Sequence, residues 1–310
     1  MASLRSIIQG GRFYMDWKDR SPESYAKFNE LVGYVFKTLR SPDVVLVNAQ
    51  SVWDDLVPPV EGRDLDAWDR VSNYPNIPTP KPPFRIMWLE GIYPGTGQRF
   101  GALSLRNEVN NDLEEHLTQL SLEDSLTERI RHDHPATIIN VAVFHDFEGA
   151  ACFTGIIEYW LDDNGAFLSS FRQYPHVGFD EEGQRQQKLN LQLRQGWVLH
   201  TFARLNCHNV KLVPQKAGAP SPKRLRKHAP TVVWHEIVVE DVQVRTKRDQ
   251  LRVGEHQELR FHRVRGHYAD YTKGAGLFGK YKVRLWIEEH SRGNHEVGEV
   301  VATYKVKTVS

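Results

Sequence analysis

Three consecutive strand-like runs in the middle of the chain constrain its fold more than any other feature. They cover Thr137–Phe147, Ala150–Leu161 and Ala166–Tyr174. The segment 162–165 (DDNG) joins the last two, and Asn-Gly is a strong signal for a tight β-hairpin. A helical pattern over Glu181–Leu205 follows only after all three runs. Because strands and helices do not alternate regularly, the sequence predicts an α+β protein rather than a doubly wound parallel sheet.

The residues ahead of these runs predict further elements of the same domain. Ser21-Pro22-Glu23 combines an N-cap, a proline and an acid in the first turn, and apolar residues then follow at helical spacing. Further predicted elements are strands at Asp43–Val47, Phe84–Tyr93 and Gln98–Arg106, and helices around 113–120 and 121–130. We therefore expect a mixed N-terminal domain with antiparallel strands and about four helices.

Charge is distributed unevenly along the 310 residues. Residues 1–214 contain 21 Lys and Arg against 28 Asp and Glu, whereas the rest of the chain contains 19 against 11. The segment 216–230 (KAGAPSPKRLRKHAP) is rich in Pro and Ala and basic, as interdomain linkers often are. The sequence thus predicts an acidic α+β domain over 1–214, a basic Pro-rich linker over 215–230 and a basic β-rich domain over 231–310.

Four strand-like runs predict a small antiparallel sheet in the C-terminal domain. They cover Thr231–Glu240, Arg260–Tyr271, Lys280–Glu288 and Glu299–Lys307. In the third run, apolar Tyr281, Val283, Leu285 and Ile287 alternate with Lys280, Lys282, Arg284 and Trp286. Side chains alternate between the two faces of a strand, so the first set is expected in the core and the second in solvent.

The same alternation predicts one strongly cationic sheet face. Its expected members are Arg263, Arg265, His267, Lys280, Lys282, Arg284, Trp286, Lys305 and Lys307. Arg forks, Lys point charges and an aromatic face are the groups that contact phosphates and stacked bases. Such a face could also be merely solvated, or covered by the acidic N-terminal domain.

One glycine motif and several histidine pairs suggest other chemistry only weakly. The segment 274–279 (GAGLFG) matches G-x-G-x-x-G, but a strand pattern rather than a helix follows, so we expect a hairpin loop. The pairs His132/His134, His262/His267 and His290/His295 lack thiolate partners. We expect neither a metal nor a cofactor.

Cysteine usage and hydropathy indicate a soluble cytoplasmic protein. Cys152 and Cys207 are the two cysteines, and they do not form a C-x-x-C pair, which suits a reducing compartment. No stretch approaches the ~20 consecutive apolar residues that a membrane span needs. The first residues also lack the pattern of a secretory signal. We expect no association with a membrane.

A metal-independent ribonuclease is an alternative for the C-terminal domain. Cleavage by the 2′-hydroxyl needs a base, an acid and cations for the developing charge. His267, His290, Tyr271, Arg265 and Arg292 supply these types of group, with Lys280 nearby. On a continuous strand His262 and His267 face opposite sides, so His262 is expected in the core and His267 among the cations.

Several short motifs resemble a module found in uncharacterised proteins of phages and actinobacterial mobile elements. They are His262-Arg-Val-Arg-Gly-His267, Gly276-Leu-Phe-Gly-Lys-Tyr281, Trp286-Ile-Glu-Glu-His290, Arg292-Gly293 and Tyr304-Lys-Val, with Asn206-Cys-His-Asn-Val210 ahead of the linker. The resemblance covers roughly the last third of the chain. It implies a genomic context and no catalytic residues.

Three hypotheses remain open at this point. The first is a nucleic-acid-binding protein of phage or mobile-element type, whose partner is RNA or DNA and whose contact surface is the cationic sheet face. The second is the ribonuclease that uses His267 and His290. The third is a non-enzymatic interaction or structural component that docks a protein partner with an acidic surface.

Overall fold

The chain forms two compact units. The computed structural model describes residues 3–11, 13–14, 22–56, 81–93, 96–108, 135–163, 167–173, 181–215, 233–240, 260–264, 266–277, 280–288, 290–292 and 294–299. The first unit consists of residues 1–206 and 211–238, and the second unit of residues 207–210 and 239–310.

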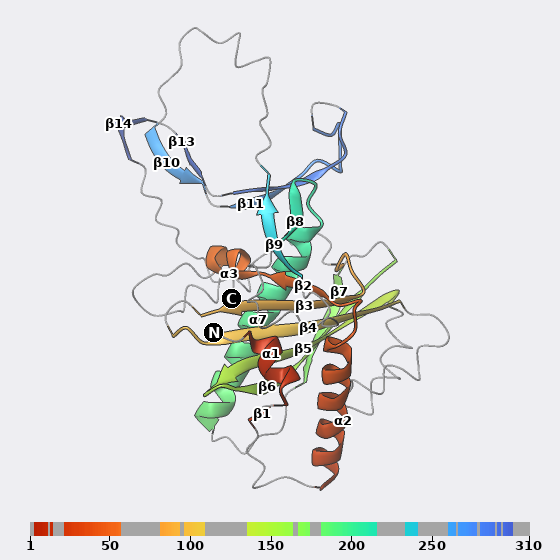
Figure 1. The fold of residues 1–310 in the computed structure, drawn as a ribbon. Coiled ribbons are helices and arrows are strands. Elements are labelled where there is room, and N and C mark those ends of the chain that lie inside the picture. Colours follow the sequence, from red (N-terminus) through yellow and green to blue (C-terminus); the bar gives the residue numbers. More distant parts are fainter. Residues whose placement is uncertain are drawn as a thin grey trace, which may run out of the picture. The chain divides into compact units, whose positions relative to one another are not determined.

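A nine-stranded mixed sheet forms the centre of the first unit (Figure 1). Its strands are β1 (Phe13–Tyr14), β2 (Val45–Asn48), β3 (Ile86–Ile92), β4 (Arg99–Glu108), β5 (Thr137–Phe147), β6 (Ala150–Leu161), β7 (Phe167–Gln173), β8 (Val210–Pro214) and β9 (Trp234–Val239). Their order is β1-β6-β5-β4-β3-β2-β9-β8, and β7 also pairs with β6. Strands β3 to β7 run antiparallel in sequence order, while β2 is parallel to β3 and β9. The mixture of this sheet with separate helices confirms the α+β class.

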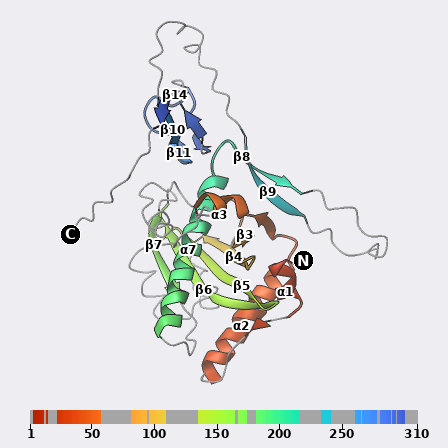
Figure 2. The same cartoon turned by 90° about the vertical axis from the view of Figure 1, so that its left-hand side faces the viewer.

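Helices cover both faces of this sheet. The described helices are α1 (Leu4–Gln9), α2 (Pro22–Leu39), α3 (Gln50–Leu56) and α7 (Glu181–Leu205). Helices α1 and α2 lie on one face, and the long helix α7 crosses the other (Figure 2). Among the described helices, none combines the length and the apolar character that crossing a membrane requires.

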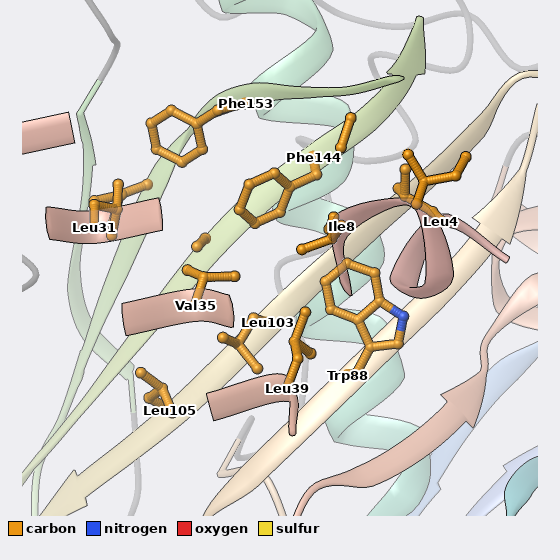
Figure 3. Packing of buried hydrophobic residues seen from close by; sticks show 14 of the residues in the cluster. Leu4, Ile8, Leu31, Val35, Leu39, Trp88, Leu103, Leu105, Phe144 and Phe153 are labelled. Carbon is orange, nitrogen blue, oxygen red and sulfur yellow. The ribbon is translucent and has the colours of Figure 1, made fainter. Parts of the chain in front are cut away.

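The face under α1 and α2 carries the main aliphatic core. Leu31, Val35 and Leu39 lie at successive i+4 positions of α2 and are fully or almost fully buried. They pack on the sheet together with Leu4 and Ile8 of α1 (Figure 3). The sheet residues beneath them are Trp88, Leu103, Leu105, Phe144 and Phe153. Burial of each such side chain contributes about 1.5–3 kcal/mol, so this core anchors both helices.

The opposite face carries an aromatic cluster, which consists of Trp53, Tyr93, Phe100 and Trp197. Phe100 lies at its centre, with ring centroids 4.6 Å from Trp53, 4.9 Å from Tyr93 and 4.8 Å from Trp197. The Trp197 indole also donates a hydrogen bond to the Ala49 carbonyl oxygen, at 3.1 Å. These contacts join α3 and α7 to strands β3 and β4.

The second unit contains two small sheets. Strand β10 (Arg260–Val264) lies between β13 (His290–Arg292) and β14 (Asn294–Glu299), and β11 (His267–Asp270) pairs antiparallel with β12 (Arg284–Ile287). Asn209 stabilises β12 from outside the sheet. Its side-chain amide donates to the Trp286 carbonyl at 2.7 Å and accepts from the Trp286 N–H at 2.9 Å.

Three predictions for the C-terminal sheet were wrong. The run Arg260–Tyr271 forms two strands that belong to separate sheets, because β10 ends at Val264 and β11 begins at His267. The run Thr231–Glu240 forms β9, which pairs with β2 in the first unit rather than with the C-terminal strands. The run Lys280–Glu288 is a strand only from Arg284 to Ile287.

Other predicted segments lie outside the described residues. These are the two helices around 113–130, the linker residues 216–230 and the strand after Glu299. Several described elements were not predicted, namely α1, α3, β1, β8, β13 and β14.

Candidate functional site

The loop between β11 and β12 contains part of the predicted cationic surface. This β11–β12 loop covers residues 271–283, and backbone hydrogen bonds close it. The Tyr271 N–H donates to the Val283 carbonyl at 2.9 Å, and Leu277 and Tyr281 exchange hydrogen bonds at 2.8 and 3.0 Å. Gly276 has a φ of +83°, and a Cβ there would lie 2.8 Å from the Tyr281 carbonyl oxygen. The described part of the G-x-G-x-x-G segment, residues 274–277, therefore lies in a loop between two antiparallel strands, as predicted.

Three consecutive residues of this loop are exposed. Lys280 and Lys282 are exposed, and Tyr281 between them keeps 58% of its surface accessible. Lys273, on the other arm, is exposed as well. The Lys282 ammonium donates to the Gly274 carbonyl oxygen, which holds that side chain across the loop. Because residues 271–283 contain no Asp or Glu, the exposed lysines give the loop a positive surface beside the exposed Tyr281 ring.

The predicted positions of two aromatic residues were exchanged. Trp286, expected on the exposed face, is only 3% exposed, and its ring meets Tyr268 edge-on at 4.7 Å. A Cβ at Gly266 would lie 2.7 Å from the Trp286 ring, so the glycine makes room for it. Tyr281, expected in the core, is exposed. The reason is that residues 280–283 belong to the loop, where strand alternation does not apply.

Arg284 lies at the base of the loop and is already paired. Its guanidinium contacts the Asp270 carboxylate at 3.0 Å, and its side chain is 19% exposed. The hydrogen bond from the Thr272 hydroxyl is the main cause that lowers the pKa of Asp270 to about 2; burial opposes it, and the Thr272 N–H and Arg284 lower the pKa further. This carboxylate offsets the Arg284 charge, so Arg284 offers less to a phosphate than the loop lysines.

The predicted catalytic groups are not brought together by any described contact. His267 is exposed on β11, and Tyr271 is half-buried in the loop. The other predicted residues of the three-stranded sheet are Arg263 on β10, and His290 and Arg292 on β13. Their side chains, together with Arg265 and Lys305, lie outside the described part.

The prediction that His262 and His267 share one continuous strand was wrong. His262 is on β10 and His267 is on β11, and these strands belong to different sheets. In the register of its own sheet, His262 lies opposite Arg292, and Val264 lies opposite His290. Because the two histidines lie on separate strands, the alternation of side chains along a strand does not relate their orientations.

A second polar cluster, which the sequence analysis did not predict, lies beneath α7 in the first unit. Its centre is Arg194, of which only 2% is exposed. One guanidinium nitrogen, Nη1, donates to the Thr154 hydroxyl at 2.7 Å. The guanidinium also lies 5.7 Å from the Tyr93 ring centroid and 5.9 Å from that of Phe100. Among the described residues, its Nε has no hydrogen-bond partner.

Two strands bring a histidine and a cysteine to this cluster. His145 on β5 and Cys152 on β6 are directly opposite one another in the antiparallel register. Their neighbours Phe144 and Phe153 belong to the core under α1 and α2, so alternation turns His145 and Cys152 toward α7. His145 Nδ1 lies 3.0 Å from the Thr154 hydroxyl.

Burial and the Arg194 charge set the protonation of both groups. Burial, and then the Arg194 charge, lower the pKa of His145 to about 3, so the imidazole is neutral at neutral pH. Burial raises the pKa of the Cys152 thiol, and Arg194 acts in the opposite direction. The cluster therefore contains one fixed positive charge and neutral groups around it.

A signal for this cluster was present in the sequence. Leu191, Arg194, Trp197 and Val198 lie at i, i+3, i+6 and i+7, which places them on one face of α7. An arginine within such an apolar stripe is unusual, because Arg is almost never fully buried unless it is paired. The helix over Glu181–Leu205 was predicted, but the burial of Arg194 on it was not.

Neither a metal centre nor a relative suggests a chemistry for either site. Within the described part of the chain, no three His, Cys, Asp or Glu side chains gather closely enough to bind a metal ion. No protein-family model, curated protein or solved structure matches the chain. The two candidate sites are therefore interpreted from their geometry and charge.

Proposed function

We propose that the second unit binds nucleic acid, with the β11–β12 loop as its contact surface. The observation that carries this proposal is the exposed Lys280-Tyr281-Lys282 triplet in a loop without acidic residues. Lysines on either side of an exposed ring present the two groups that single-stranded nucleic acids bind, charge for the phosphates and an aromatic face for a base.

The loop geometry supports this function in two further ways. Lys273 adds a third cation on the opposite arm, so a phosphate backbone that crosses the loop would meet positive charge on both sides. The glycines Gly274 and Gly276 have positive φ and no side chains, which allows a backbone or a phosphate to approach closely. A narrow loop of this kind suits a single strand better than a duplex groove.

The ribonuclease alternative has less geometric support. His267 and His290 lie on strands of different sheets, and no described contact connects either of them to Tyr271. The protein-partner alternative invokes the same loop, because an acidic protein surface would also be attracted to the three lysines. A nucleic acid is favoured over an acidic protein because Tyr281 offers a ring for stacking.

Fluorescence anisotropy with single-stranded RNA and DNA oligonucleotides at increasing salt tests the proposal. Each phosphate contact that is lost should reduce the slope of log K against log salt by about 0.7 for a single strand. The double substitution Lys280→Gln and Lys282→Gln should therefore flatten the slope by about 1–1.5 units.

Lys211→Gln is the matched control, since Lys211 is an exposed lysine of the first unit and lies outside the loop. It should leave the slope unchanged. An unchanged slope in the double variant would place the contact elsewhere, and absence of binding to either nucleic acid at low salt would overturn the proposal.

A further inference from the structure

We propose that the first unit contains a binding site for an oxyanion, a phosphate or carboxylate group, with Arg194 as its cationic centre. The site, called the Arg194 site below, is formed by Arg194, Tyr93, His145, Cys152 and Thr154. All five residues lie in the first unit, so this inference does not depend on nucleic-acid binding by the second unit.

No described acidic side chain balances the charge of the Arg194 guanidinium. A buried charge is costly unless a counter-charge or a full set of hydrogen bonds compensates it. Arg194 is 2% exposed, and within the described chain its guanidinium makes one hydrogen bond and no ion pair with a carboxylate. The two aromatic rings beside it offset part of the cost. The remaining charge calls for an anion.

Arg204, on the same helix, is a buried arginine whose charge is balanced by a carboxylate. It is buried to the same 2%, but its Nη1 lies 2.7 Å from the Asp55 carboxylate. The two arginines are ten residues apart on α7 and differ in that one has an acidic partner. The fold thus places a carboxylate against one buried arginine and leaves the equivalent position at Arg194 to another anion.

The hydrogen-bond donors around the guanidinium also favour an anion as the ligand. Two buried donors, the Arg194 Nε–H and the Tyr93 hydroxyl, have no hydrogen-bond partner among the described residues. The Nε atoms of Arg5 and Arg284 are likewise without a partner among the described residues, so the Arg194 Nε–H supports the site only together with the uncompensated charge. An oxyanion beside the guanidinium would balance its charge and accept a hydrogen bond from the Arg194 Nε–H, and Tyr93, whose ring centroid lies 5.7 Å from the guanidinium, carries the second donor.

The neighbours of Arg194 are less deeply buried than Arg194 itself. Arg194 itself is buried, but Tyr93, His145 and Cys152 are each partly exposed. The buried guanidinium is thus surrounded by residues that are themselves partly exposed. Within the aromatic cluster, the Trp197 indole nitrogen already donates to the Ala49 carbonyl oxygen, and the Trp53 indole nitrogen has no hydrogen-bond partner among the described residues. The site therefore suits a small anionic group rather than an extended polar ligand.

Thermal denaturation of the full chain at constant ionic strength tests the proposal, with inorganic phosphate in one series and acetate in the other. A ligand that binds only the folded protein raises Tm as its concentration exceeds Kd. Each tenfold increase should raise Tm by about 3–5 °C in whichever series contains the preferred anion. Arg194→Met should abolish this dependence, and Arg204→Met should keep it.

Alkylation of Cys152 tests the same site in the unaltered protein. Iodoacetate is an anion and iodoacetamide is neutral, so their rate ratio reports attraction by Arg194, whereas the thiolate fraction cancels. We expect the ratio at Cys152 to fall by about three- to tenfold in Arg194→Gln. Phosphate or acetate should slow the reaction of iodoacetate in the natural sequence. Cys207, which is 3% exposed, serves as the internal reference.

The outcomes separate the possibilities. Anion-dependent Tm that Arg194→Met removes, or anion protection of Cys152, supports the site, and the more effective anion identifies phosphate or carboxylate. If Tm rises equally in both arginine variants and no anion protects Cys152, the effect is a general salt effect and the proposal is overturned. Neither result bears on the affinity of the second unit for nucleic acid.

Discussion

Both units place cations beside an aromatic ring, but with opposite exposure. In the first unit, the Arg194 guanidinium lies 5.7 Å from the Tyr93 ring and is 2% exposed. In the second unit, Lys280 and Lys282 flank Tyr281, which is 58% exposed. Exposed charges act over about a Debye length and are screened by salt, whereas buried charges act at short range and are screened little.

Exposed and buried cations differ in the ligands that they can recognise. Three exposed lysines can attract a long polyanion and tolerate many geometries, which suits phosphates along a nucleic-acid strand. A single buried guanidinium with fixed neighbours can accept only a group of the right size and charge. Substitutions at the two sites should therefore have different effects on stability and on binding.

The largest effect is expected for Trp286→Ala in the second unit. The Trp286 side chain is 3% exposed and contacts the Tyr268 ring, while the hydrogen bonds to Asn209 involve only the Trp286 backbone and remain in the variant. Truncation of a buried Trp costs about 3–5 kcal/mol, a large part of the stability of a small domain. Hydrogen exchange in peptides that cover β11 and β12 should accelerate strongly, whereas peptides of β5 and β6 should not change.

Such a result would separate structural from functional aromatic residues in the second unit. Trp286→Phe, which keeps an aromatic ring, is the control and should recover part of the protection. If Trp286→Ala leaves exchange unchanged, Trp286 is not part of the core of this unit.

The next largest effect compares the two buried arginines of α7. Arg204→Met breaks its contact with Asp55 and should destabilise the first unit by about 1–3 kcal/mol, a moderate value because Asp55 is half-exposed and can be solvated. Arg194→Met removes an uncompensated charge and fills a similar volume. In buffer without phosphate or carboxylate it should cost less than about 1 kcal/mol, or stabilise.

Urea denaturation of both variants measures this comparison. Equal losses of stability would show that the Arg194 guanidinium has compensation of the same strength as Arg204. That result would remove the charge argument for the Arg194 site, although the anion titrations would still decide whether the site binds.

A third prediction concerns acid. The folded-state pKa of His145 is about 3, below the usual 6.5, so the unfolded chain binds more protons between these values. Its contribution to stability is therefore complete above about pH 6.5 and is lost as the pH falls toward 3. His200 behaves alike, because burial, and then the Arg204 charge, lower its pKa to about 3.

The second unit should respond in a lower pH range. Asp270, with a folded-state pKa of about 2 against an ordinary 3.8, loses its contribution only as the pH falls from 3.8 through 2. Between pH 6 and pH 4, hydrogen exchange should therefore accelerate first in β5 and α7 and not in β11 and β12. His145→Gln should reduce the acid sensitivity of the first unit. Equal acid sensitivity of both units would contradict this prediction.

Segments whose structure depends on local sequence patterns were predicted better than segments whose structure depends on distant contacts. Strands β5 and β6 and helix α7 have the predicted bounds, because their apolar patterns and turns are encoded locally. The turn between β5 and β6 illustrates this. Glu148 and Gly149 both have positive φ, as a two-residue hairpin loop with the native twist requires.

Distant pairing explains what could not be predicted. Trp234–Val239 has a strand pattern, but nothing in it indicates that β2, nearly 190 residues earlier in the chain, is its partner. The burial of Trp286 depends on Gly266 and Asn209, and that of Arg194 on Thr154, forty residues away. Residue types suggested a cationic surface, but only tertiary structure distinguishes the loop lysines from the paired Arg284.

The smallest effect on stability, and the sharpest functional contrast, is expected for Tyr281. Its ring is exposed, so Tyr281→Ala should change the free energy of unfolding by no more than about 0.5 kcal/mol. Loss of a stacked base should nevertheless weaken binding to single-stranded oligonucleotides by about 1–3 kcal/mol. Because no charge is removed, the salt slope should stay unchanged. Tyr281→Phe keeps the ring and should bind like the natural sequence. If Tyr281→Ala binds equally well, the loop attracts phosphates by charge alone, and its aromatic ring has no part in recognition.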